Sequence, residues 1–382
     1  MNQPVCIVPC SDYDQSTVSA AFDALLACAD LLDWVRPGMT VGIKVNLIAP
    51  RRPDAAVTTH PAPVRELCRR LIERGAKVIV GDSPGGLYTP AILERIYQSA
   101  GLKCVEEVGA SLNYDVSESQ KSFPEGHILH EYSFTAWLDR CDAVISFAKL
   151  KTHGMMGMTA AVKNLFGVIP GTKKPEYHYL YPSTMDFAHM LVDLCRAVKP
   201  TLSLIDGVWG MEGNGPTGGN PRHAGVLLAS RDPYACDVLA GALMGITPDG
   251  APLLMAANAQ GLAPLSADEL DIRGEWKSFV QPDWKKITGE THATFSQNGP
   301  LIDRLMQTAL RRRPKLDPAL CIGCAECAKV CPAHAISMRE TAGGKRPRFD
   351  YGKCIRCFCC QEFCPRSALI VHRGAIARLL SR

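Results

Sequence analysis

The chain has 382 residues, of which 47% are hydrophobic and 21% charged, and its formal net charge is +4. This composition excludes a disordered or fibrous chain, and the length suits one large α/β domain with a small appended module. No stretch of about 18 uninterrupted apolar residues offers a membrane span, and residues 1–11 lack the pattern of an export signal. We therefore expect a cytoplasmic protein with no membrane span.

Short β-branched runs alternate with helical stretches through the first 250 residues. The predicted strands are residues 5–9, 40–47, 77–81, 143–148, 201–206 and 225–230. The predicted helices are residues 17–33, 63–74, 90–100, 183–199 and 233–244. Because this alternation is typical of βαβ units, we expect an α/β fold: a mostly parallel twisted sheet with helices on both faces.

Three polar segments, residues 81–86, 149–154 and 206–216, each follow a predicted strand. Ligands of such sheets bind beyond the carboxyl ends of the strands, so the three segments would meet at one edge. The glycines of 81–86 would let backbone N–H groups approach an anion, although no nucleotide motif is present and an ordinary turn fits as well. The glycine-rich segment 206–216 predicts either a mobile lid or a close-packed wall.

Lys149, Lys151 and His153 lie in the second of these segments. Two lysines and a histidine at a strand end, followed by a helix start, are typical of an anion site. The alternative is that the lysines are solvated strand-end charges and that His153 has no chemical role.

Seven segments of the N-terminal region resemble a family named domain of unknown function 362: residues 42–47, 59–61, 81–84, 149–153, 161–167, 206–207 and 232–237. The resemblance spans about residues 5–275. It implies an α/β domain that is often fused to a two-cluster ferredoxin module, and it implies no substrate. We accordingly expect an α/β domain over residues 1–310 and a second domain, with a basic linker and a C-terminal tail, over residues 311–382.

Eight cysteines near the C-terminus form two copies of the spacing C-x2-C-x2-C-x3-C-P. In this motif three thiolates ligate one [4Fe-4S] cluster and the fourth ligates the other. We therefore predict two [4Fe-4S] clusters, one bound by Cys321, Cys324, Cys327 and Cys364, and the other by Cys354, Cys357, Cys360 and Cys331.

Zinc binding and disulfide bonds are the alternatives for these thiols, and neither explains two complete four-cysteine copies. Cys359 is a ninth thiol inside the second motif, and we expect it to be a spectator. The other eight cysteines occur singly, which fits a reducing cytoplasm.

Residues 316–371 resemble a bacterial two-cluster ferredoxin, with short strands expected at 335–339 and 346–350. Residues 311–382 contain 15 Lys and Arg against 5 Asp and Glu, whereas residues 1–310 contain 27 against 33. With no nucleic-acid-binding motif present, this +10 charge favours an acidic redox partner of the ferredoxin or flavodoxin type over nucleic acid.

Two functions follow from this pattern. In the first, an oxidoreductase passes single electrons from a soluble donor through the clusters to an anionic small molecule. Lysines would neutralise the charge of this small molecule, and His153 would supply a proton. An acidic side chain would orient or relay that proton. The candidate catalytic residues are His153, Lys151 and Glu212, and the candidate binding residues are Lys44, Lys149, Lys163 and Asp206. In the second, a non-enzymatic carrier docks a client protein and reduces it.

Overall fold

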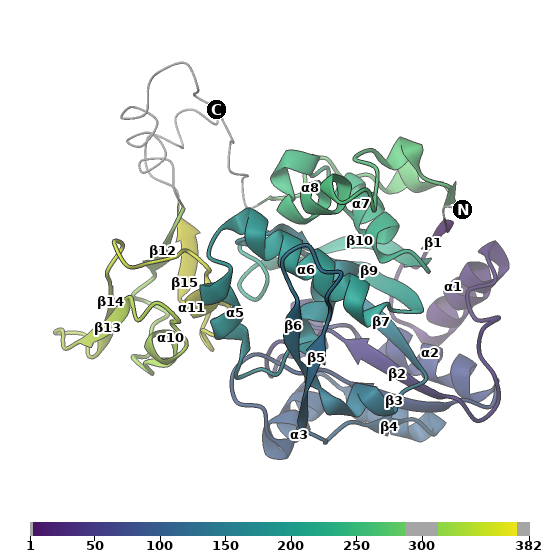
Figure 1. The fold of residues 1–382 in the computed structure, drawn as a ribbon, viewed down its shortest axis with the longest axis horizontal. Helices are drawn as coiled ribbons and strands as arrows, with labels where there is room; N and C mark the ends of the chain where they lie inside the picture. The colour runs from purple at the N-terminus through teal and green to yellow at the C-terminus, as the bar shows by residue number, and fades with distance from the viewer. Residues whose placement is uncertain (1–2, 287–311, 373–382) are drawn as a thin grey trace.

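The computed structural model describes residues 3–286 and 312–372. These residues form a large α/β body and a small C-terminal module at its side (Figure 1). The predicted boundary between residues 310 and 311 lies outside the described residues, as does the C-terminal tail from residue 373.

Within the described residues, nine strands form the main sheet, in the order β11-β1-β10-β9-β7-β2-β3-β4, with β8 paired to β7. The strands are β1 (Val5–Pro9), β2 (Thr40–Val45), β3 (Lys77–Gly81), β4 (Ser111–Leu112), β7 (Ala143–His153), β8 (Gly157–Thr159), β9 (Leu202–Glu212), β10 (Asn220–Ser230) and β11 (Ile272–Arg273). Strands β2, β3, β4, β7 and β9 pair in parallel, and only the pairs made by β10 and β8 are antiparallel. The predicted mostly parallel α/β sheet is confirmed.

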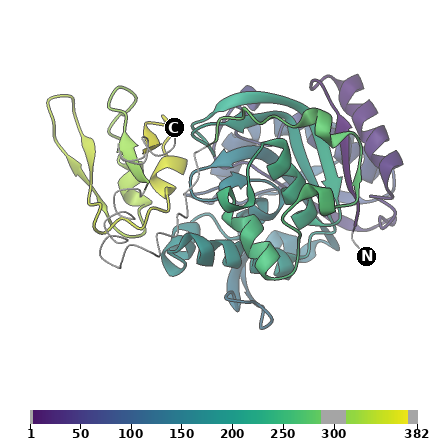
Figure 2. The ribbon, with the colours of Figure 1, turned by 90° about the horizontal axis from the view of Figure 1, so that it is seen from above.

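Helices cover both faces of this sheet (Figures 1 and 2). One face carries α1 (Gln15–Cys28), α2 (Pro61–Ile72) and α3 (Pro90–Ser99). The other carries α4 (Ala161–Asn164), α6 (Thr184–Val198), α7 (Pro233–Leu243) and α8 (Pro252–Ala259). Helix α5 (Lys174–Leu180) and the hairpin of β5 (Glu118–Ser122) and β6 (Glu131–Thr135) lie outside these two layers.

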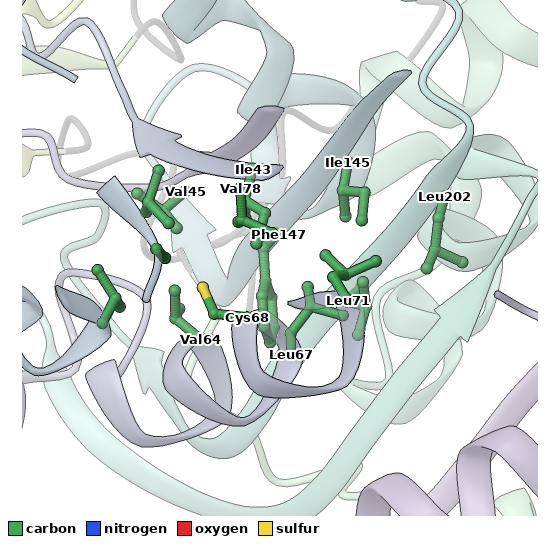
Figure 3. Packing of buried hydrophobic residues seen from close by; sticks show 14 of the residues in the cluster. Ile43, Val45, Val64, Leu67, Cys68, Leu71, Val78, Ile145, Phe147 and Leu202 are labelled. Carbon is green, nitrogen blue, oxygen red and sulfur yellow. The ribbon is translucent and has the colours of Figure 1, made fainter. Parts of the chain in front are cut away.

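Helix α2 packs its apolar face on the centre of the sheet (Figure 3). Val64, Leu67, Cys68 and Leu71 recur at intervals of one to four residues, so they fall on one side of the helix. They meet the alternating side chains of the central strands, which are Ile43, Val45, Ile145 and Phe147. Because these residues are almost fully buried, the packing holds the carboxyl ends of β2, β3 and β7 side by side.

Strands β7 and β9 are longer than the sequence predicts. Residues 149–153 were expected as a loop, yet they continue β7 and pair with β8, Lys151 opposite Thr159. Likewise, residues 206–212 continue β9 and pair with β10. The polar and glycine residues that suggest loops fit within these strands. The lysines have partners inside the domain, Asp206 for Lys149 and the Val57 carbonyl oxygen for Lys151. Glycine is required at position 210 because a Cβ there would lie 2.8 Å from the Leu150 carbonyl oxygen.

The turn after β9 is a close-packed wall, the second of the two expectations for this segment. At Gly215 a Cβ would lie 2.1 Å from the carbonyl oxygen of Thr152, so only glycine allows the two backbones to approach this closely.

The C-terminal module contains two short antiparallel pairs and two helical turns. Strand β12 (Arg313–Leu316) pairs with β15 (Leu369–His372), and β13 (Ile336–Arg339) pairs with β14 (Arg346–Phe349). The helices are α10 (Glu326–Lys329) and α11 (Cys359–Glu362). β13 and β14 lie within the two ranges predicted for strands.

Candidate functional site

A cavity of about 70 Å³ lies where the C-terminal module meets the carboxyl ends of β2 and β3 and the hairpin of β7. It is lined by charged and polar side chains: Lys44, Asn46, Asp82, Ser83, His153, Lys163, Asn164, Lys174, His178 and Glu362. A water molecule needs roughly 10–15 Å³ of such space, so the cavity has room for a small molecule or several waters.

Lys44 is held in place by a buried ion pair. Its Nζ lies 2.7 Å from Oδ1 of Asp82 and donates to Oδ1 of Asn164 at 2.9 Å. Burial lowers the pKa of Lys44, and the carboxylate of Asp82 opposes this shift. At Gly167 a Cβ would lie 2.2 Å from both Lys44 Nζ and Asp82 Oδ1. Gly167 therefore leaves the space that this pair occupies.

Lys174, at the start of α5, is the second buried lysine of the cavity. Its Nζ donates to the carbonyl oxygens of Ser83, at 2.5 Å, and Ile169, at 2.7 Å. Burial lowers its pKa to about 7, and Asp82 offsets part of that effect. Lys174 is thus a cation whose charge changes near neutral pH.

Lys163 is the third lysine. Its side chain is partly exposed, and its Nζ lies 5.5 Å from the centre of the Phe166 ring. Burial lowers its pKa, which Glu362 and the thiol of Cys359 partly offset. We find no hydrogen bond or close ion pair for its Nζ within residues 3–286 and 312–372. Lys163 therefore has donors available for a bound molecule.

His153 faces the module. Its Nδ1 accepts from the backbone N–H groups of Met155 and Met156, at 3.0 and 3.1 Å, so the neutral ring carries its proton on Nε2. Nε2 lies 2.9 Å from Oε1 of Glu362. Burial, and then the charge of Lys163, lowers the pKa of His153 to about 4. Burial raises the pKa of Glu362, but His153 and Lys163 outweigh it and the pKa falls to about 2.

His178 lines the same cavity from α5 and stacks on Phe187, with ring centres 4.2 Å apart. Its ring is 2% exposed, and its Nδ1 has no hydrogen-bond partner among the described residues. Burial lowers its pKa to about 3, so the ring is neutral at physiological pH. A buried nitrogen without a partner is costly, which points to a ligand that would supply one.

With both histidines neutral and Lys174 protonated, three lysines face two carboxylates in the cavity, which leaves one excess positive charge. A buried cation without a counterion is unfavourable, so the cavity is suited to an anion.

Helix α11 of the module forms one wall of the cavity. Glu362 and Phe363 line it, and the Phe363 ring fills the space at Gly85, where a Cβ would lie 2.3 Å from the ring. Gly85 and Gly86 therefore accommodate the module, a role that sequence reasoning missed.

Hydrogen bonds hold α11 in this position. Nε2 of Gln361 donates to Oδ1 of Asn214 at 2.9 Å and to the carbonyl oxygen of Gly215 at 3.2 Å. Arg51 donates to the carbonyl oxygens of Cys364 and Pro365. The cavity and the cysteine motifs are thus parts of one junction.

The eight motif cysteines line two separate hollows within the module. One is lined by Cys321, Cys324, Cys327 and Cys364. The other is lined by Cys331, Cys354, Cys357 and Cys360, together with Cys359. Each hollow thus contains three cysteines of one motif and the fourth of the other. This grouping fits the crossed ligand sets expected for a pair of [4Fe-4S] clusters.

Of the seven site residues that the sequence suggests, Lys44, Lys163 and His153 line the cavity. Lys151 lies behind it, donating to Oδ1 of Asn46 at 2.5 Å and to the Val57 carbonyl oxygen at 2.7 Å. Burial lowers its pKa well below the usual value.

The other three residues lie apart from the cavity. Lys149 and Asp206 form a fully buried pair at 2.7 Å, which Tyr13 joins through hydrogen bonds to both. Glu212, near the end of β9, lies 3.4 Å from Lys285 and 3.9 Å from Arg222.

Asp82, Lys174, His178 and Glu362 line the cavity and were not among the predicted site residues. Asp82 could have been found from its place directly after β3. Glu362 follows the cavity lysines by 188 residues or more in sequence, and no local pattern links them.

Comparisons with known proteins agree with this architecture. A family model described as "Domain of unknown function (DUF362)" matches residues 41–242, which is more than half of the chain. The chain belongs to the DUF362 family. A second model, "4Fe-4S dicluster domain", matches residues 313–365, so the DUF362 domain is followed by an iron–sulfur module. The predicted fusion is confirmed.

A "thylakoid-associated protein" from Synechocystis sp. is 30% identical over 292 residues, which are 75% of this chain and 88% of that protein. This DUF362 protein is also similar to two solved structures. The lactate racemase apoprotein from Thermoanaerobacterium thermosaccharolyticum is 11% identical, with a TM-score of 0.34 over 53% of this chain and 50% of that one. A protein from Thermotoga maritima is 12% identical, with a TM-score of 0.36 over 69% and 61%. The chain thus spans less than two thirds of either structure.

None of the helices in the described residues combines the length and apolar character needed to cross a membrane.

Proposed function

We propose that this protein is a redox enzyme in which single electrons from a soluble donor pass through two [4Fe-4S] clusters to a small anionic molecule in the cavity. Helix α11 is the observation that carries the proposal. Cys360 and Cys364, one from each predicted ligand set, flank Glu362 and Phe363 in sequence, and these two residues line the cavity. A molecule in contact with Glu362 or Phe363 would therefore touch residues that are at most three positions along the chain from a predicted ligand of each cluster.

The clusters would supply one-electron transfer. The chain's own residues would hold the bound molecule by hydrogen bonds and stabilise its negative charge. Each electron adds one negative charge to the bound molecule. Lys163, which has free donors, would bind that charge, and Lys44 and Lys174 would stabilise it from fixed positions. His153 is neutral, so its Nε2–H would donate a hydrogen bond to the bound molecule rather than a proton, and the unpartnered Nδ1 of His178 would offer a second imidazole nitrogen. Lys151 would act only through its charge.

Lys149, Asp206 and Glu212 have no place in this mechanism. Lys149 and Asp206 form an ion pair with each other inside the sheet. Glu212 pairs with lysine and arginine side chains of the α/β domain.

The Lys163→Met variant tests the proposal. After anaerobic purification, small molecules released from the wild-type protein should include an anion that reoxidises dithionite-reduced clusters. With Lys163→Met, this single-turnover rate should fall about 10²- to 10³-fold, the usual effect of removing a group that stabilises developing charge. Cluster absorbance and iron content should not change.

Lys173→Met is the matched control, because Lys173 is partly exposed and pairs with Glu118 at 3.0 Å. Equal rates in the two variants, or a released fraction that leaves the reduced clusters untouched, would remove the cavity from the reaction.

Sulfate binding provides a second prediction, which needs no knowledge of the substrate. Lys174 has a pKa of about 7 and binds a proton below that pH, whereas His153, His178 and Glu362 have pKa values of about 4, 3 and 2. Sulfate should therefore bind more tightly at low pH. Its affinity should fall about tenfold between pH 6 and pH 8, because one proton is lost from the unliganded site.

Isothermal titration calorimetry would measure this dependence. Lys174→Met should abolish the pH dependence, and Lys173→Met should preserve it. A sulfate affinity that does not change with pH in the wild-type protein would contradict the role given to Lys174.

The alternative function, a carrier that reduces a docked client protein, is favoured by exposed apolar side chains next to residues that line the cavity. Leu87 is 70% exposed, and Tyr179 and Leu180 are each 58% exposed. They follow Gly85 and His178 closely in sequence. An anaerobic pull-down that yields a stoichiometric protein client, lost in Leu87→Glu, with no small-molecule turnover, would establish this function instead.

A cytoplasmic location remains part of the proposal, supported by eight single thiols in the α/β domain, none of which forms a disulfide. The thylakoid association in the name of the Synechocystis relative is the competing possibility. Fractionation of cells into soluble and membrane extracts would distinguish them.

A further inference from the structure

The two cysteine sets differ in their exposure to solvent. Each set has buried members, Cys327 in the first and Cys357 and Cys360 in the second, but only the first contains an exposed thiol, that of Cys324. The second set also lies nearer the cavity, because Phe358, which lines its hollow, belongs to the same buried cluster as Phe166, which lines the cavity. The first set is therefore the outer one, and a donor protein would meet it first.

Exposed apolar side chains lie in the same loop as the exposed thiol. Ile322 is 62% exposed and Leu320 is 41% exposed, and Ile322 lines the same hollow as Cys324. These are two of the few large hydrophobic side chains that the described residues expose. We define the outer surface as Leu320, Ile322 and Cys324. An apolar centre around a redox group is suited to docking, since apolar contacts form the core of protein interfaces.

Basic side chains border this surface. Arg366 is exposed and lines the hollow of the first set, and Lys345 lies beside Gly323. Lys345 and Lys329 have exposed partners in Glu340 and Glu326. Such exposed pairs are weak, so their lysines can exchange partners on docking.

The difference in net charge between the two parts of the chain also favours an acidic partner. Residues 311–382 carry +10 and residues 1–310 carry −6. Two oxidised clusters of about −2 each leave the module at about +6. An acidic donor would be repelled by the α/β domain and attracted to the module.

Resting on the proposed function, we infer that the outer surface is the docking site for a small acidic electron-transfer protein. Its apolar centre would contact Ile322, and electrons would enter beside Cys324. At each encounter one electron would leave the donor and reduce the cluster that the first cysteine set would hold, with no proton transferred.

The test measures affinity, with flavodoxin, an acidic flavoprotein, as the probe. Ile322→Glu should weaken flavodoxin binding to the cluster-loaded protein at least tenfold at low ionic strength. Ile370→Glu is the matched control. Ile370 is 38% exposed on β15 of the same module and does not line the hollow of the first set, so this variant makes the same charge change elsewhere. It should weaken binding less than threefold.

Ile322→Ala removes the apolar contact without adding charge and should weaken binding about threefold. It keeps the test valid if the glutamate variant loses iron. Dithionite, which needs no docking site, should reduce all variants at one rate. Equal affinities for Ile322→Glu and Ile370→Glu would overturn the inference, and so would a wild-type dimer that Ile322→Glu converts to a monomer.

Failure of the proposed function would look different. In that case, Lys163→Met would leave reoxidation of the clusters unchanged while the affinities for flavodoxin still differed between the two glutamate variants.

Discussion

Removing Cys331 together with Cys354 should leave about four of eight irons, whereas removing Cys331 together with Cys321 should leave almost none. Cys331 and Cys354 line the same hollow in the structure, although they belong to different motifs. Removing one ligand already releases its cluster, so removing a second ligand of the same cluster should release no further iron. Cys321 lines the other hollow, and its loss should add to that of Cys331.

Iron and sulfide analysis of anaerobically prepared alanine variants measures this directly. Cys359→Ala is the control and should retain about eight irons, because Cys359 is a ninth thiol outside the spacing pattern. The reverse result, with Cys331 and Cys354 additive and Cys331 and Cys321 not, would show that each motif ligates its own cluster.

Asp206→Asn should destabilise the α/β domain by about 3–5 kcal/mol, the usual cost of breaking a buried ion pair from one side. Asp206 accepts hydrogen bonds from Tyr13 and from the backbone N–H of His60, and it pairs with Lys149 at 2.7 Å. Asparagine would leave the Lys149 ammonium group buried without a counterion. Thermal unfolding followed by circular dichroism measures the loss.

Glu212→Gln is the control for this experiment, because the partners of Glu212 are partly or largely exposed and its loss should cost less than about 1 kcal/mol. Replacing Lys149 and Asp206 together by methionine and leucine should recover much of the stability, since no unpaired charge then remains. A loss for Asp206→Asn no larger than that for Glu212→Gln would contradict a stabilising role for the pair.

The layout of the fold was predictable from local patterns. Strands β1 and β3 match the predicted ranges, because their β-branched residues are bounded by turn signals. Strands β7 and β9 could not be predicted to their ends. Lys149 and Lys151 suggest a solvent-exposed loop, and only their tertiary partners, Asp206 and Asn46, allow them to lie buried within a strand.

The grouping of the motif cysteines in two hollows was predictable because a fixed spacing brings such residues together within one small module. The cavity was predictable only in part. The edge of the sheet and Lys44, Lys163 and His153 followed from strand order, since parallel strands end on the same side. Glu362 and Phe363 could not be found, because their position depends on how the module packs on Gly85.

Helix α11 brings Cys360 and the cavity residue Glu362 onto one helix, a proximity that would link the charge state of the module to binding in the cavity. The Glu362 carboxylate on this helix lies 2.9 Å from His153, while Cys360 and Cys364 are its neighbours in sequence. If an anion in the cavity makes the protein harder to reduce by a given factor, reduction must weaken binding of that anion by the same factor. A tenfold factor corresponds to about 59 mV for one electron. A midpoint potential measured with and without a saturating candidate molecule would therefore report the ratio of its affinities for the oxidised and reduced protein.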